Sequence, residues 1–145
     1  GSRRSPLRES SAAAEVERRQ VLAGQRAGGP LRLFMIYTAG NFIEASEESP
    51  FFQIGEHKYG KPILDRVVRP ETKLNDTITA ALLSMDSTLR SNLSVGMPLD
   101  LAVIKRDAYT FELLVRIEED DESFREISSA WSTALREGFA NIGGI

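Results

Sequence analysis

The chain has 145 residues, a formal net charge of −3 and 41% hydrophobic residues, which suits one soluble domain with its own core. It has no cysteine and a single histidine, His57, so disulfides, zinc ribbons and nucleophile systems that need more than one imidazole are excluded. The acidic balance argues against nucleic-acid binding, and no apolar run approaches the ~20 residues of a membrane span. We therefore expect a cytoplasmic protein without nucleic-acid or membrane partners.

The first 21 residues are expected to be a tag remnant followed by a poorly ordered leader. Gly1-Ser2 is typical of a cloning scar. The residues that follow are rich in Arg, Ser and Ala and offer little apolar surface, so Ala12–Leu22 is expected as a frayed helix or as disorder. The folded part is then expected over residues 22–145.

Three short strands are predicted at the start of this folded part. Apolar side chains alternate along Leu31–Tyr37, which indicates a strand buried on at least one face. Thr38–Asn41 has turn composition, and Phe42–Ala45 is predicted to pair back on the first strand. Phe51–Ile54 is the third predicted strand.

Two helices are predicted next. Helical spacing runs from Glu56 to Val68 and stops at Pro70. A longer helix follows, with Thr72 as its expected N-cap. Its core face is predicted from a stripe of apolar residues, namely Leu74, Ile78, Leu82, Met85, Leu89 and Leu93.

The last part of the sequence predicts a hairpin and a final helix. Leu99–Lys105 and Tyr109–Ile117 are the two strands of the hairpin. The acidic run Glu118–Glu122 is predicted to open the helix; a cation site is the competing interpretation of this run. Hairpins alternate with helix pairs in this order of elements, so the predicted fold class is α+β with antiparallel sheet.

Three features of the sequence could carry chemistry. The segment Gly55–Lys61 has the spacing of a phosphate-binding loop, but Pro62 stands where magnesium binding needs a hydroxyl. No carboxylate pattern surrounds His57, so we expect a surface residue. The segment Ser84–Ser94 is rich in hydroxyls, which either form a solvated flank of the apolar stripe or face a site.

Two stretches carry specific motifs, RLFMIYTAGNFIEASEESPFFQIGEHKYGKPILDRV from Arg32 and SMDSTLRSNLSVGMPLDLAVIKRD from Ser84. Together they resemble the bacterial proteasome-type peptidases called Anbu (ancestral beta subunit), and more broadly the second half of a proteasome beta subunit. The resemblance covers residues 22–145. It implies an N-terminal-nucleophile hydrolase with a four-layer αββα sandwich of antiparallel sheets, present here only as its C-terminal half.

The resemblance also implies a reaction and its supporting residues. In this family an N-terminal threonine attacks the peptide bond, which needs neither Cys nor His. Position 1 is Gly, so no catalytic residue is expected in this chain. The family's Arg-Asp-x-x-Ser-Gly motif is matched by Arg90 and Ser94, whereas Ser91 replaces its Asp; Ser91 or Asn92 is expected to substitute by hydrogen bonding.

Two functions follow from the resemblance. The first is the supporting half of a threonine peptidase that acts on peptides without a cofactor or metal. The second is a non-catalytic module that assembles with copies of itself into a ring or a helix. Half of a four-layer sandwich leaves apolar faces uncovered, which we expect on the Leu33/Met35 face and on one face of the Tyr109–Ile117 strand.

Overall fold

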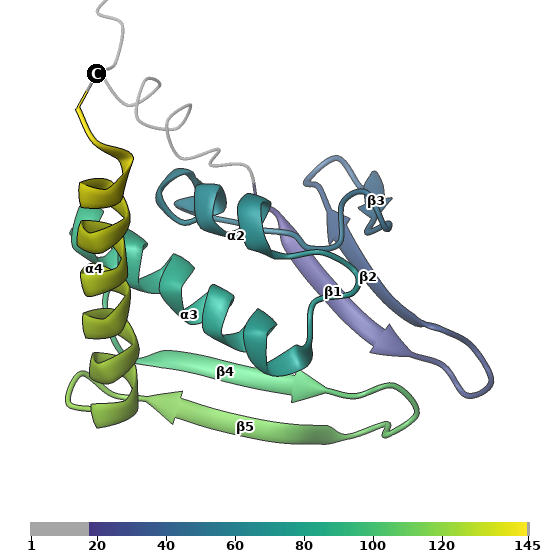
Figure 1. Ribbon diagram of the computed structural model, residues 1–145. Helices are drawn as coiled ribbons and strands as arrows, with labels where there is room; N and C mark the ends of the chain where they lie inside the picture. Colours follow the sequence, from purple (N-terminus) through teal and green to yellow (C-terminus); the bar gives the residue numbers. More distant parts are fainter. Residues whose placement is uncertain (1–17, 145) are drawn as a thin grey trace, which may run out of the picture. The chain divides into compact units, whose positions relative to one another are not determined.

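The computed structural model describes residues 18–144, which divide into two compact units, one ending at Ile54 and the other beginning at Gly55 (Figure 1). Both contain antiparallel sheet, and the second also contains the helices, so the chain is α+β as the sequence predicts. No helix among residues 18–144 is long and apolar enough to cross a bilayer.

The first unit is a three-stranded antiparallel sheet in the order β1-β2-β3. Its strands are β1 (Gln20–Gln25), β2 (Leu31–Ile36) and β3 (Phe42–Glu44). The predicted turn between β2 and β3 is confirmed: Gly40 adopts φ +87°, and its N–H donates to the carbonyl of Tyr37 at 2.9 Å.

Two predictions for this unit are wrong. A helix is expected up to Leu22, but Gln20–Leu22 belong to β1. This strand pairs with β2 along its whole length, with Gln20 opposite Ile36 and Gln25 opposite Leu31. Pairing with a neighbouring strand outweighs local helix propensity here. Residues 51–54 form no strand, since a short apolar segment does not by itself supply a hydrogen-bonding partner. The rest of the predicted leader, residues 1–17, lies outside the described residues.

The second unit contains a hairpin and a set of helices. After a short 3₁₀ turn (η2, His57–Tyr59), the elements are α2 (Lys61–Val67), α3 (Leu74–Ser91), β4 (Leu99–Ile104), β5 (Phe111–Ile117) and α4 (Glu122–Ile142). The hairpin is confirmed, with Leu99 opposite Ile117 and a bulge between Val103 and Ile104. α3 contacts η2, α2 and α4, so it links the helices of this unit.

The ends of the helices differ in detail from the predictions. The helix expected over residues 56–68 is divided by Gly60 into η2 and α2. Thr72 does not cap α3; its hydroxyl accepts a hydrogen bond from the Arg69 N–H at 2.8 Å, and Lys73 is the N-cap. Asp121 caps α4 by accepting from the Phe124 N–H at 2.8 Å, so the acidic run does open this helix.

The predicted core face of α3 is confirmed at its centre but not at its two ends. Its central residues, Ile78, Leu82, Met85 and Leu89, are half-buried. Its two ends are not core residues, because Leu74 is 41% exposed and Leu93 is fully exposed. The expected uncovered faces also differ: Met35 is buried, whereas Phe111, Leu113 and Val115 of β5 are exposed as expected.

Exposed arginine–carboxylate pairs cross both sheets. Arg32 on β2 donates two hydrogen bonds to Glu44 on β3, at 2.7 and 2.8 Å, and Arg116 on β5 donates two to Asp100 on β4, at 2.8 and 3.0 Å. These hydrogen bonds lower the pKa of both carboxyl groups. Because all four side chains are exposed to water, the pairs specify strand register more than they add stability.

A close approach between backbones joins η2 and α2 to α3. Gly60 is buried, and a Cβ built on it would overlap the Ser84 hydroxyl and lie 2.7 Å from the Ser84 carbonyl oxygen. Ala80, Ser84 and Thr88 are the buried residues spaced four apart along this side of α3. Small side chains at these positions let the two segments pack at short range.

We predict that Gly60→Ala destabilises the chain by roughly 1–3 kcal/mol, because the added methyl group overpacks the contact with Ser84. Gly138→Ala is the matched control, since nothing lies within 4 Å of a Cβ there and alanine favours helix. The free energies of unfolding of both variants are measured by urea unfolding monitored by circular dichroism. A Gly60→Ala variant as stable as the parent chain would contradict the packing described here.

Candidate functional site

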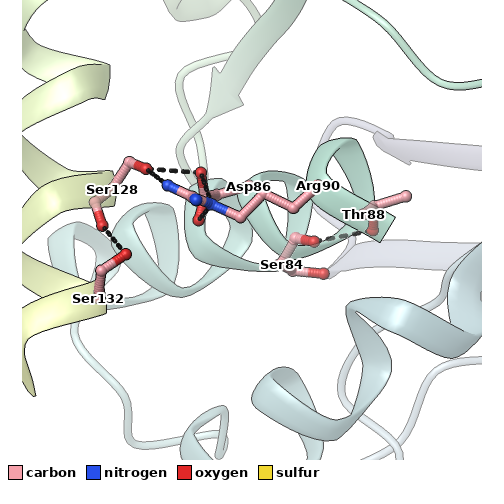
Figure 2. Close-up of polar contacts among 6 residues, drawn as sticks. All are labelled: Ser84, Asp86, Thr88, Arg90, Ser128 and Ser132. Atoms are coloured by element: carbon pink, nitrogen blue, oxygen red, sulfur yellow. Dashed lines mark hydrogen bonds and ion pairs between the residues drawn. The ribbon is translucent and has the colours of Figure 1, made fainter. Parts of the chain in front are cut away.

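A polar cluster around a buried carboxylate joins α3 to α4 (Figure 2). The Ser128 hydroxyl donates to Asp86 Oδ1 at 2.7 Å and accepts a hydrogen bond from Arg90 Nη2 at 2.7 Å. Arg90 Nε completes the triangle by donating to the Asp86 carboxylate at 3.1 and 3.2 Å. We call these three residues the α3–α4 clamp.

The clamp provides partners for a buried charge, the carboxylate of Asp86. The Asp86 side chain is only 8% exposed, whereas the Arg90 side chain is 60% exposed. A buried carboxylate is costly unless it is paired and hydrogen-bonded. Asp86 receives both kinds of partner, one from its own helix at position i+4 and one from α4, so its burial depends on the two helices being held together.

The opposite side of α3 accounts for two of the hydroxyls in the segment Ser84–Ser94. Ser84 and Thr88 are both buried, and the Thr88 hydroxyl donates to the Ser84 carbonyl at 2.9 Å (Figure 2). They are therefore neither a solvated flank nor groups that face a site. The small side chain of Ser84 permits the approach of Gly60, which is a third role that the periodicity of the sequence did not indicate.

The four predicted supporting residues fall into separate groups. Arg90 turns toward α4 and belongs to the clamp. Asn92 and Ser94 form a compact turn after α3, in which Asn92 Oδ1 accepts from the Ser94 N–H at 2.9 Å and from the Ser94 hydroxyl at 2.7 Å. Ser91 is the exposed last residue of α3.

Sequence reasoning missed two residues of the clamp. Asp86 stands four residues before Arg90, a spacing that predicts a helical ion pair and could have been noticed. Ser128 lies 42 residues after Asp86 on another helix, and no local pattern indicates their contact.

The other candidate sites are not supported by the structure. The segment Gly55–Lys61 does not follow a strand as a phosphate-binding loop does, and Lys61 pairs with Asp65 on its own helix. His57 is an exposed residue whose Nδ1 lies 3.1 Å from the Gly55 carbonyl oxygen, as expected for a surface position. Among residues 18–144, no group of three His, Asp or Glu side chains could hold a metal ion.

The chemistry available to the clamp is positioning. Its hydroxyl is shared between a carboxylate and a guanidinium, and neither group at neutral pH activates a serine as an imidazole or a free amine does. The clamp instead fixes the C-terminal turn of α3 and so determines where the following segment, residues 92–96, leaves the helix.

We predict that Asp86→Ala lowers the free energy of unfolding by roughly 1–3 kcal/mol, because it removes the buried acceptor that links the two helices. Asp100→Ala, which removes an exposed carboxylate paired with Arg116, is the matched control and should leave stability near that of the parent chain. Equal effects of the two substitutions on the urea midpoint would contradict a special role for the clamp.

The chain was compared with protein-family models, curated proteins and solved structures. No protein-family model matches it, and a search of curated proteins finds no match. Among solved structures it is similar to Anbu from Hyphomicrobium sp. strain MC1, with 51% identity and a TM-score of 0.87 over 94% of this chain and 59% of that one. Anbu (ancestral beta-subunit) from Yersinia bercovieri gives 47% identity and a TM-score of 0.87, over 96% of this chain and 62% of that one.

A third similar structure is the helical assembly of the Anbu complex from Pseudomonas aeruginosa, with 45% identity and a TM-score of 0.84. The match covers 96% of this chain and 59% of that one, so the chain spans about three fifths of the length of these relatives. Identity this high over nearly the whole chain, together with the same fold, shows that the chain belongs to the Anbu (ancestral beta-subunit) family.

Proposed function

We propose that this chain is the supporting, C-terminal part of a proteasome-like threonine peptidase. The observation that carries the proposal is the 45–51% identity to Anbu structures over 94–96% of the chain. In the proposed reaction, an N-terminal threonine outside this chain attacks the peptide bond, with its own amino group as base. Residues 22–145 then belong to one half of a four-layer αββα sandwich, and the enzyme acts on peptides in the bacterial cytoplasm without a metal or cofactor.

The turn after α3 has the hydrogen-bonding polarity that such a nucleophile needs. The Ser94 hydroxyl donates its proton to Asn92 Oδ1, which leaves its lone pairs free to accept a hydrogen bond from an amino group. Ser94 is exposed, so another segment can reach it. Asn92, rather than Ser91, makes the contact that orients Ser94, and we assign it the role of the family's Asp.

The proposal predicts an order of effects in a longer form of the protein that carries the threonine. Ser94→Ala and Asn92→Ala should each lower the turnover of a fluorogenic peptide about tenfold or more, because a misplaced nucleophile loses its alignment. Ser91→Ala is the control and should stay near the parent rate.

Two outcomes would contradict the proposal. The first is robust peptide cleavage by the 145-residue chain alone, which would place catalysis within it. The second is an unchanged rate in the Ser94→Ala variant, which would show that the turn after α3 takes no part in the reaction.

A second candidate function, a non-catalytic assembly module, is favoured by apolar side chains that the chain leaves uncovered. Leu114 on β5 is 69% exposed, and Phe139 and Ile142 on α4 are each 81% exposed. Large apolar side chains in such numbers are typical of association surfaces. The relative from Pseudomonas aeruginosa forms a helical assembly, and we propose that this chain likewise associates with copies of itself, in a ring or a helix.

The proposed association predicts that light scattering gives a mass above the 16.1 kDa of one chain. The double substitution Phe139→Ser with Ile142→Ser should lower that mass or the affinity, because it removes apolar area from α4. A monodisperse monomer that binds no hydrophobic dye would contradict the association.

A further inference from the structure

A groove of about 470 Å³ lies between the C-terminal end of α3 and one side of α4. Arginines line it from both helices: Arg90 from α3, and Arg125 and Arg136 from α4. Between the two α4 arginines the lining residues are serines, and Phe124 and Met97 add apolar surface. The peptidase proposal does not use this groove, although Arg90 and Ser128 of the clamp are among its lining residues.

The spacing along α4 places its arginines and serines on one face of the helix. Ser129 follows Arg125 by four residues and Ser132 precedes Arg136 by four, so each arginine neighbours a hydroxyl on the same helix face. Arg90 reaches across from α3 to Ser128, and Ser132 lies one turn further along α4 (Figure 2). A ligand over Ser129 and Ser132 therefore lies between Arg125 and Arg136 along α4, with Arg90 on the facing helix.

The charges of the groove favour an anion. Asp86 neutralises Arg90, and Glu119 is the one carboxylate among the lining residues. Within residues 18–144 no carboxylate forms an ion pair with Arg125 or Arg136, and Arg136 makes one long hydrogen bond to the Thr133 hydroxyl at 3.3 Å. The groove is thus locally positive in a chain of net charge −3.

We propose that this groove binds the phosphate group of a small ligand. Guanidinium groups form paired, charge-assisted hydrogen bonds with phosphate and with carboxylate. The Ser128 and Ser132 hydroxyls already donate to Asp86 and to the Ser128 carbonyl, so the donors for a ligand are Arg125, Arg136, the Ser129 hydroxyl and the remaining N–H groups of Arg90. These are still more donors than the two oxygens of one carboxylate can accept, whereas phosphate presents three or more oxygens and a larger charge. A volume of about 470 Å³ also leaves room for an organic part beside the phosphate.

The test is titration of the full 145-residue chain with inorganic phosphate, at constant ionic strength maintained with sodium chloride. Calorimetry should give saturable binding at about one phosphate per chain, and the melting temperature should rise with phosphate. Arg125→Gln and Arg136→Gln should each weaken binding about tenfold. Arg106→Gln removes the same charge from the β4–β5 turn, outside the groove, and should bind as the parent chain does.

Three results would overturn the proposal. The first is the absence of saturable binding beyond the chloride control. The second is unchanged binding in both Arg125→Gln and Arg136→Gln, with far-ultraviolet circular dichroism confirming that these variants fold. The third is acetate binding as tightly as phosphate, which would make the groove a carboxylate site. Should either arginine variant fail to fold, Ser129→Ala takes its place, and undiminished binding there also overturns the proposal.

Discussion

The buried carboxylate of Asp86 is the constraint on which the helical unit depends. A charge in that position requires hydrogen bonds, and they come from Arg90 on the same helix and from Ser128 on α4. The two helices cannot separate without exposing or orphaning the carboxylate. Because Arg90 is the penultimate residue of α3, the clamp also determines where the segment that follows α3 begins.

α3 uses its two sides for two different kinds of packing. One side holds small buried residues, Ser84 among them, and brings the backbone of Gly60 into direct contact. The other side holds the clamp. The combination fixes α3 between its neighbours without large buried side chains, which suits a unit whose β5 strand and α4 helix still present wide apolar surface. Exposed apolar surface of this kind is typical of association with further protein, which both proposed functions require.

Local sequence patterns predicted most of the elements but few of the contacts. The hairpin of residues 99–117, the long helix beginning near Leu74 and the helix opened by the acidic run could all be predicted, because period and turn composition are local signals. β1 could not, since it exists through pairing with β2, and the strand expected at residues 51–54 has no such partner. The same distinction between local and distant contacts holds for the site. The turn at Asn92 and Ser94 is local in sequence, whereas the contact of Asp86 with Ser128 joins residues 42 positions apart.

The clamp is tested most directly by a double-mutant cycle between Asp86 and Ser128, measured as free energies of unfolding in urea. The structure predicts that Asp86→Ala and Ser128→Ala are not additive, with a coupling energy of about 1 kcal/mol or more, because each substitution removes the same buried hydrogen bond. Additivity within about 0.3 kcal/mol would show that the two side chains do not interact and would contradict the account of how α3 is held to α4.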